Sequence, residues 1–417
     1  MTSEQRRESP YPMVPVAEAQ RLITAHIAPL PAEIISSLTA DGRVPAEDIC
    51  ATENTPDVAK AMVDGYALRA ADGIGERRVL AEVTAGLADD IRVEPGTAVR
   101  IMTGAPVPPG ADAVVMVEYT TEAAGMLRIE QPVSPGAHIQ TVGQDIYEGQ
   151  QILTRGTVLG AADIGLLATV GRTRIPVYRQ PRVAVLATGD EVVEPDAPRR
   201  AGSVRDSNRY ALLAAIREAG GEGISLGIAR DTMEEQRAAI EAGLAQADML
   251  ITSGGVSMGT RDLIKPLLAA LGTIHFGRVA FKPGKPTLFA TVNDPERGTL
   301  PVFGLPGFPV SSLVSFEVFV RPALRRLQGD GHPERPKIRV ALLDAIRPAR
   351  DRPEYQRVVI AWQDGRLVAR STGAQSSNRL LSLRGANGLL IVPPRERVYA
   401  AGETLEALVT GTLRNEP

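Results

Sequence analysis

Glycines, carboxylates and lysines gather in five short segments between residues 188 and 311, and each segment follows an extended or apolar run. These segments are Thr188-Gly189-Asp190-Glu191, Arg230-Asp231, Ser253-Gly254-Gly255-Val256-Ser257 continuing to Asp262, Lys282-Pro283-Gly284-Lys285-Pro286, and Gly304-Leu305-Pro306-Gly307-Phe308-Pro309-Val310-Ser311. In an open parallel sheet, ligands bind beyond the carboxyl ends of the strands. We therefore expect the five segments to meet along one edge of a sheet.

The residue types in these segments favour a phosphorylated ligand and a metal ion. Glycines let backbone N–H groups approach an anion, and the N-termini of the following helices add positive potential. Lys282 and Lys285 supply full positive charges. Glu191, Asp231 and Asp262 would repel a phosphate unless a divalent cation lay between them, so the pattern predicts Mg²⁺.

Each of these residues also has an ordinary structural explanation. Asp231 has the spacing to cap a helix beginning near Thr232, and Asp262 is suited to the first turn of a helix. Glu191 is followed by two valines and is compatible with a surface strand, and the lysines with a solvated loop. What favours a site is the recurrence of all of them at strand ends.

A second pattern, Gly255-Val256-Ser257-Met258-Gly259, matches the G-x-S-x-G turn of serine hydrolases. That turn needs its serine directly after the strand, whereas here a Gly-Gly pair follows the predicted strand end at Thr252. The four histidines are scattered and have no metal-ligand spacing. The Gly-Gly pair thus disfavours a serine hydrolase, but a hydrolase that uses Ser257 is kept as an alternative to the phosphate site.

Alternation of strands and helices between residues 179 and 328 predicts the element that positions these segments. Strands are expected at residues 182–187, 224–229, 248–252 and 301–304, and helices at 208–219, 232–247, 262–271 and 309–327. This order is typical of a mostly parallel sheet covered on both faces. We therefore expect an α/β sandwich domain here.

The flanking segments have other periodicities. Residues 13–38 have an apolar pattern at helical spacing that Pro29 and Pro31 interrupt, and residues 76–160 contain short apolar runs separated by Gly and Pro. Beyond Gly329 the short runs at residues 337–343, 356–362, 366–369, 388–392 and 403–409 predict a small β-barrel or sandwich. The fold class is thus α/β plus β, with several domains.

Composition limits the classes of partner. The 417 residues predict about two to four domains. A net charge of −3 gives no general attraction for nucleic acid or for an anionic membrane. Cys50 is the single cysteine, so no intramolecular disulfide forms, and neither a spanning apolar run nor a signal-peptide pattern is present. We expect a cytoplasmic protein.

Specific motifs resemble those of the molybdopterin molybdenumtransferases, which share their fold with the C-terminal domain of gephyrin. The resemblance covers nearly the whole chain from about residue 13. The motifs are Ala61-Met62-Val63-Asp64-Gly65-Tyr66-Ala67, Met102-Thr103-Gly104-Ala105-Pro106, Gly143-Gln144-Asp145-Ile146, Asp206-Ser207-Asn208, and the five segments above. Three positions depart from the family's pattern, namely the inserted Val63, Phe308 in place of Asn, and Asn378 in place of Ser.

The resemblance implies an elongated homodimer of four-domain subunits. A discontinuous, helical dimerisation domain (13–58 and 143–178) would flank a β-rich domain (59–142), followed by the α/β molybdopterin-binding domain (179–328) and a C-terminal β-barrel-like domain (329–417). The active cleft would form between the α/β domain of one subunit and the β-rich domain of the other.

The resemblance also implies roles for individual residues. Asp64, Thr103 and Asp145 would reach the cleft from the partner, while Glu191, Asp231 and Asp262 would hold Mg²⁺. The implied ligand-binding residues are Thr188, Gly189, Ser253, Gly254, Gly255, Ser257, Lys282, Lys285, Pro306, Gly307, Pro309, Ser311, Arg357 and Ser382. Of these, Ser311, Arg357 and Ser382 would lie near molybdate.

The implied reaction takes adenylylated molybdopterin and molybdate to the molybdenum cofactor and releases AMP. The ligand supplies its own dithiolene sulfurs, so no catalytic cysteine is needed, and Cys50 lies outside every motif. Transient contacts with the adenylylating enzyme and with molybdoenzymes are implied as well. A non-catalytic scaffold of the same fold remains an alternative, because a fold does not determine an activity.

Overall fold

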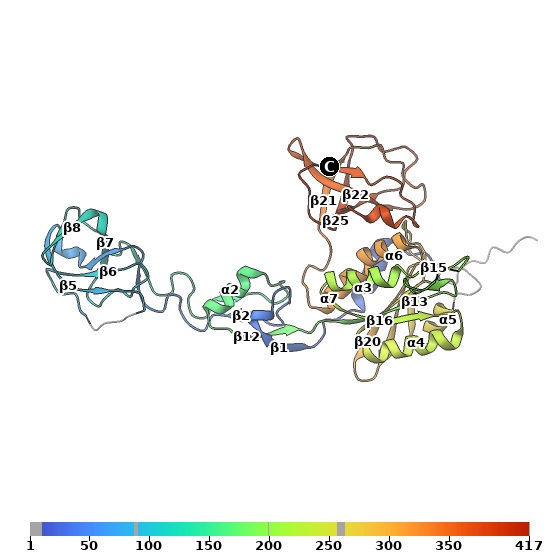
Figure 1. Ribbon diagram of the computed structural model, residues 1–417, viewed down its shortest axis with the longest axis horizontal. Helices are drawn as coiled ribbons and strands as arrows, with labels where there is room; N and C mark the ends of the chain where they lie inside the picture. The colour runs from blue at the N-terminus through green and yellow to red at the C-terminus, as the bar shows by residue number, and fades with distance from the viewer. Residues whose placement is uncertain (1–10, 87–90, 199, 257–262, 417) are drawn as a thin grey trace, which may run out of the picture.

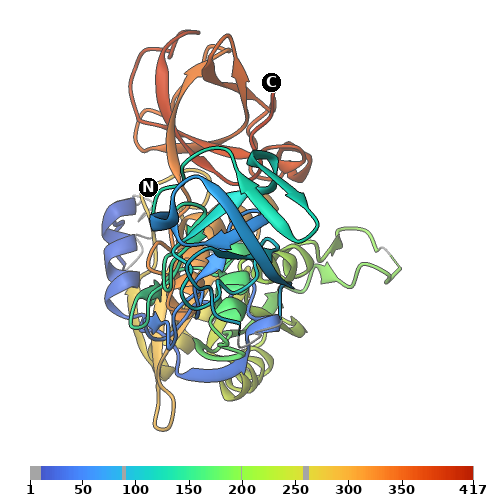
Figure 2. The same ribbon diagram turned by 90° about the vertical axis from the view of Figure 1, so that its left-hand side faces the viewer.

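The chain forms an elongated molecule of several packed units. The computed structural model describes residues 11–86, 91–198, 200–256 and 263–416. A β-rich unit lies at one end, a small mixed unit lies in the middle, and an α/β unit with a barrel beside it lies at the other end (Figure 1). Viewed along the long axis, the barrel lies at the top of the molecule (Figure 2). The multidomain α/β plus β architecture is therefore confirmed.

The α/β unit is built on a six-stranded sheet in the order β16-β13-β17-β20-β19-β18. Four strands are parallel, as predicted: β16 (Glu222–Ala229), β13 (Arg182–Thr188), β17 (Met249–Ser253) and β20 (Gly298–Leu305). Two further strands were not predicted: β19 (Leu288–Asp294) runs antiparallel to β20, and β18 (Thr273–Phe276) pairs antiparallel with β19 at the edge of the sheet.

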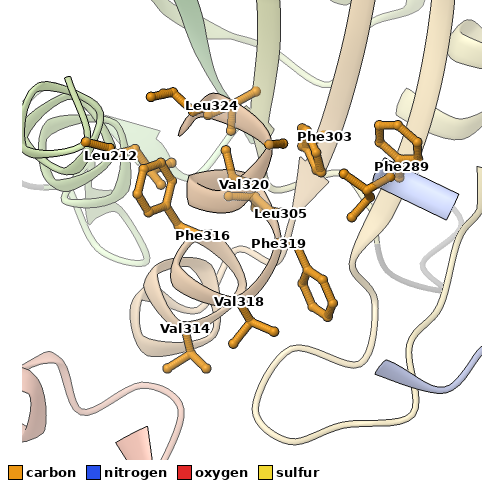
Figure 3. Packing of buried hydrophobic residues seen from close by; sticks show 14 of the residues in the cluster. Leu212, Phe289, Phe303, Leu305, Val314, Phe316, Val318, Phe319, Val320 and Leu324 are labelled. Atoms are coloured by element: carbon orange, nitrogen blue, oxygen red, sulfur yellow. The ribbon is translucent and has the colours of Figure 1, made fainter. Parts of the chain in front are cut away.

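Helices cover both faces of this sheet because side chains alternate along each strand. Val183 and Val185 of β13 pack into one apolar core, whereas Ala184 and Leu186 pack into a second. The helices are α3 (Asn208–Glu218), α4 (Met233–Gln246), α5 (Ile264–Leu271), α6 (Pro309–Ser315) and α7 (Arg321–Leu327), with a π-helical turn at Phe316–Val320 joining the last two. Figure 3 shows the first core, in which Phe316 and Val320 of this turn lie among residues of the sheet and α3.

The first helix, α1 (Val16–Ala25), packs against the α/β unit. Ala19 and Ile23 on its apolar face lie in the same core as Val183 and Phe289. The helical pattern does not continue to residue 38, because Pro29 and Pro31 interrupt it and β1 (Ala32–Ser36) follows.

The middle unit combines two segments that are distant in sequence. Strand β1 pairs with β12 (Arg174–Tyr178), and β2 (Ile49–Cys50) pairs with β11 (Gln151–Leu153). Helix α2 (Ala161–Thr169) packs Leu167 against Ile49 and Val177.

The β-rich unit contains a six-stranded sheet in the order β7-β4-β6-β5-β9-β8. Its strands are β4 (Gly65–Leu68), β5 (Gly75–Val83), β6 (Thr97–Ile101), β7 (Ala113–Met116), β8 (Thr120–Ala123) and β9 (Met126–Ile129). The short strands β3 (Lys60–Ala61) and β10 (Ile139–Gln140) pair where the chain enters and leaves this unit.

The C-terminal unit is a closed barrel in the order β21-β23-β22-β24-β25, as predicted. The strands are β21 (Lys337–Leu342), β22 (Glu354–Gln363), β23 (Arg366–Ser371), β24 (Gly388–Val392) and β25 (Thr404–Val409). Backbone hydrogen bonds join it to the α/β unit, since Lys282 N–H donates to Pro353 O and Tyr355 N–H donates to Lys282 O. None of the described helices combines the length and apolarity that a membrane crossing requires.

Candidate functional site

A cavity of about 920 Å³ opens at the carboxyl ends of the parallel strands. It brings together eleven of the residues singled out from the sequence: Thr188, Gly189, Glu191, Asp231, Ser253, Gly254, Gly255, Pro306, Gly307, Pro309 and Ser311. The turns after β13, β16, β17 and β20 supply them. They meet because parallel strands end at the same edge.

Close backbone packing shapes the floor of this cavity. Gly254 has φ of 96°, and a Cβ at this position would lie 2.8 Å from the carbonyl oxygen of Thr188. A side chain here would therefore force apart the turns after β13 and β17. Asn208 at the start of α3 then ties two turns together, because its Nδ2 donates to Ser253 Oγ at 2.8 Å and to Gly307 O at 2.8 Å.

Two of the three predicted metal-binding acids line the cavity. Asp231 does not cap α4, because Thr232 is the N-cap residue and its hydroxyl accepts from Glu235 N–H at 3.3 Å. Instead, Asp231 Oδ1 accepts a hydrogen bond from Gln236 Nε2 at 3.2 Å, and its side chain lies at the cavity with Glu191. The capping explanation for Asp231 is therefore wrong.

The donor set suits a hard cation. Carboxylate oxygens are the ligands Mg²⁺ prefers, and it commonly takes one or two from the protein together with ligand phosphates. Glu191 and Asp231 both line this cavity and supply two such carboxylates. Asp262 and Ser257 lie outside the described residues, and within the described part no group of three or more acidic, histidine or cysteine side chains forms a complete metal cage.

A second cavity, of about 810 Å³, lies between the α/β unit and the barrel, and positively charged side chains line it. Lys282, Lys285, Arg347 and Arg352 line it, and Pro286 and Ser311 line both cavities, so the two adjoin. The sequence suggested that the segment with both lysines follows an extended run of the sheet. In the structure, this segment instead precedes strand β19, which is antiparallel to β20. It reaches the same edge because β19 runs in the opposite direction and begins with Leu288 beside Gly304.

Arg357 is a buried cation beneath this second cavity. Its side chain is fully buried, Nε donates to Ser382 Oγ at 3.2 Å, and Nη2 donates to Ser376 O at 3.4 Å. Nη1 has no hydrogen-bond partner among the described residues. Burial lowers the pKa of Arg357 to about 10, so the guanidinium still carries its charge at neutral pH. A buried cation with an unused donor is suited to an oxyanion.

Glu354 is a residue of this cavity that the sequence analysis missed. It is 2% exposed, and its Oε1 lies 3.1 Å from Lys282 Nζ. Its negative charge also opposes the lowering of the Arg357 pKa. The predicted strand began after Glu354, so no local signal singled it out. Asn208 was noted within a motif, but nothing in the sequence assigned its side chain to the site.

Asp64, Thr103 and Asp145 are not brought to these cavities within one chain. Thr103 donates to Asp64 Oδ1 from its backbone N–H at 2.7 Å and from its hydroxyl at 2.7 Å. These hydrogen bonds lower the pKa of Asp64. Both residues lie in the β-rich unit at the far end of the molecule (Figure 1), and Asp145 follows the strand by which the chain leaves that unit.

Three protein-family profiles match the chain in order. They are the MoeA N-terminal region (domains I and II) over residues 14–171, the probable molybdopterin binding domain over residues 184–326, and the MoeA C-terminal region (domain IV) over residues 339–410. A crystal structure of a molybdopterin biosynthesis MoeA protein from Pyrococcus horikoshii superposes with a TM-score of 0.82 at 31% identity, covering 96% of this chain and all of that chain.

Curated relatives agree with the profiles. The chain is 35% identical to molybdopterin molybdenumtransferase 2 of Mycobacterium tuberculosis, covering 94% of this chain and 98% of that protein. It is 37% identical to gephyrin of Dictyostelium discoideum over 98% of this chain, but it spans only 64% of that longer protein. With the convergent turns and both cavities, these similarities show that the chain belongs to the molybdopterin molybdenumtransferase family.

Proposed function

We propose that this protein is a molybdopterin molybdenumtransferase, which inserts molybdenum from molybdate into adenylylated molybdopterin with release of AMP. The observation that carries the proposal is the division of charge between two adjoining cavities. Carboxylates line one of them, and Lys282, Lys285 and the arginines line the other. A ligand with a metal-bound pyrophosphate and a separate oxyanion partner needs both environments.

The acidic cavity would hold the pyrophosphate of the pterin nucleotide. Glu191, Asp231 and Asp262 would hold Mg²⁺, which when bound supplies positive charge between these acids and the phosphates. The backbone N–H group of Gly255 and the hydroxyl of Ser253 would orient the phosphate oxygens, while the Gly254 N–H holds the turn by donating to Leu305 O at 3.0 Å. With the phosphates held there, the phosphoanhydride bond whose cleavage releases AMP would lie beside these acids.

The cationic cavity would hold molybdate. Lys282, Lys285 and the unpartnered Nη1 of Arg357 would neutralise its two negative charges, and Ser311 would offer a hydroxyl group beside the lysines. Ser382, whose hydroxyl donates to Arg379 O at 2.7 Å, would lie near molybdate as the residue that orients Arg357. Ser382 already accepts from Arg357 Nε, so its position is fixed before the ligand arrives. Preorganised donors of this kind stabilise developing charge without reorganisation during the reaction.

The complete site is proposed to require a homodimer. Asp64, Thr103 and Asp145 lie away from the cleft of their own chain, and a second subunit in the opposite direction would bring its β-rich unit there. Ile34 and Leu38 of the middle unit support this arrangement, because both are large apolar residues on the surface and Leu38 is 84% exposed. Exposed apolar residues of this kind are typical of an interface.

We further infer that the protein is cytoplasmic and that its partners are small molecules. It would meet the adenylylating enzyme and molybdoenzymes transiently. Its net charge of −3 gives no basis for binding nucleic acid or a membrane.

The direct test is AMP release from adenylylated molybdopterin by the purified chain with molybdate and Mg²⁺. We expect AMP to appear only when both inorganic ions are present, and chelation to stop it. A scaffold would release none under any of these conditions. A serine hydrolase would instead cleave simple esters and lose that activity in Ser257→Ala.

A further inference from the structure

Three large apolar side chains that remain exposed line the acidic cavity. Val204 is 57% exposed, Phe308 is 59% exposed and Leu380 is 37% exposed. They come from three separate parts of the chain: the short strand β15 (Val204–Arg205), the turn after β20, and the 3-10 helix η5 (Leu380–Leu383) of the C-terminal unit. They give this cavity an exposed apolar lining that neither a metal nor a phosphate requires.

Phe308 is held in place by its backbone, while its ring remains exposed. It is the N-cap residue of α6, and its carbonyl oxygen accepts from Ser312 N–H at 3.0 Å. The side chain takes no part in capping, so the local structure does not explain an aromatic residue here. Aromatic side chains bury about 150–250 Å² when covered, and an exposed ring therefore has much to gain from an apolar or aromatic ligand.

Polar groups lie around the same wall. Asn378 and Asn208 both line the cavity, and Asn378 Oδ1 accepts from the Ser376 hydroxyl at 2.6 Å, which orients its amide. Phe308 and Asn378 are also two of the three positions at which the sequence departs from the family's pattern. A planar face beside amide groups is what a heteroaromatic base requires, since it stacks through its face and forms hydrogen bonds through its edge.

We propose that Phe308, in the cavity that Leu380 and Val204 also line, binds the planar bicyclic heteroaromatic ring of the substrate by stacking. This inference rests on the proposed function, which supplies a substrate with two such rings, adenine and pterin. The position suits a ligand that spans both cavities, because Ser311 lies one helical turn beyond Phe308 and lines the two of them. One short segment would then contact the ring on one side and the oxyanion on the other.

Equilibrium binding of AMP and of a free pterin to the full-length protein tests the proposal and separates the two rings. Stacking on an aromatic side chain is worth about 1–3 kcal/mol by alanine substitution, which corresponds to roughly 5- to 150-fold in affinity. We expect Phe308→Ala to weaken one of the two ligands about 10-fold or more, and Phe308→Trp to keep its affinity. The ligand that loses affinity identifies the ring.

Two controls make the result specific. Val398→Ala removes another exposed apolar side chain from the barrel, away from the residues that line the cavity, and should change neither affinity. Molybdate binding should be equal in wild type and Phe308→Ala, since the oxyanion groups lie in the other cavity, and equal melting temperatures would exclude misfolding.

The proposal is overturned if the wild type binds neither ring measurably, or if Phe308→Ala binds both as tightly as the wild type does. A wild-type protein that releases AMP while its Phe308 variants bind both rings normally would refute this inference and leave the proposed function standing. A wild-type protein that releases no AMP would refute the proposed function itself.

Discussion

Lys282 and Glu354 form an ion pair of 3.1 Å across the junction between the α/β unit and the barrel. The carboxylate is buried, whereas the lysine side chain is about half exposed. Backbone hydrogen bonds of Lys282 with Pro353 and Tyr355 surround the pair. A negative charge thus lies within the cationic cavity, between the lysine loop and the buried Arg357, and partly balances both.

Replacing Glu354 with Gln should therefore separate stability from anion binding. The amide keeps the size of the side chain but removes the charge that balances Lys282 and Arg357. Without anion, we expect unfolding to become easier by about 1–3 kcal/mol, as when a buried polar group loses its partner. Added molybdate should raise the melting temperature more than it does in wild type. An equal rise in melting temperature with molybdate in both proteins would refute this role of Glu354. The matched control is Glu406→Gln, which removes a carboxylate from the exposed face of β25.

Arg357→Met should lower stability and also remove the response to molybdate. Removing one member of a group of buried charges destabilises a fold, and the Ser382 and Ser376 oxygens lose their donor, so the melting temperature without molybdate should fall. The stabilisation by molybdate should disappear, because the free Nη1 is lost. Thermal unfolding with and without molybdate measures both effects, and an unchanged molybdate response would remove Arg357 from the oxyanion site.

Asp231→Asn should lower AMP release by about 10²-fold or more, the usual scale for one catalytic or metal-binding group. The neighbouring residue provides the control. Thr232 is the N-cap of α4, so Thr232→Ala should reduce stability by about 1 kcal/mol while leaving the Mg²⁺ requirement unchanged. If the two variants behave alike in an Mg²⁺ titration, Asp231 has only a structural role.

Mixing two inactive variants tests whether the site is shared between subunits. Asp64→Asn and Asp231→Asn should each abolish AMP release. In a dimer whose clefts join different units of the two chains, each mixed dimer regains one intact cleft. Random exchange in an equal mixture should thus restore about a quarter of wild-type activity. A mixture no more active than its components would place both residues in the same chain's site, or in none.

Acid should loosen the packing of α1 on the α/β unit. The rings of His26 and His275 lie 3.8 Å apart, between centroids, and His275 stacks on Phe289. Burial, followed by the charge of His26, lowers the pKa of His275 below its ordinary value of 6.5. The unfolded chain therefore binds the proton more readily, and stability should fall as the pH drops below about 6.5. Melting temperatures at pH 7.5 and 5.5 should differ less in His275→Gln, and an equal difference would contradict the prediction.

Local patterns accounted for most of the α/β unit and for one rim of its sheet. The strands ending at Thr188, Ala229, Ser253 and Leu305 are short, mainly apolar segments that alternate with helices. This alternation predicts a parallel sheet, which placed Glu191, Asp231 and Gly254 at a common edge. The C-terminal strands were also predicted, because short runs separated by turns are local features. Long-range packing had no such local signal: α1 packs against the core of the α/β unit, and β19 pairs antiparallel with β20.

The sequence by itself determined the family, the order of the units and the turns that carry the acids and lysines, because periodicity and motif spacing are encoded within short windows. Only the tertiary structure decided that Arg357 is buried with a free donor, that Glu354 balances Lys282, and that Phe308 shares a cavity with Leu380 of the C-terminal unit. These relationships depend on how distant segments pack, and burial and electrostatic pairing in three dimensions leave no signature in the neighbouring residues.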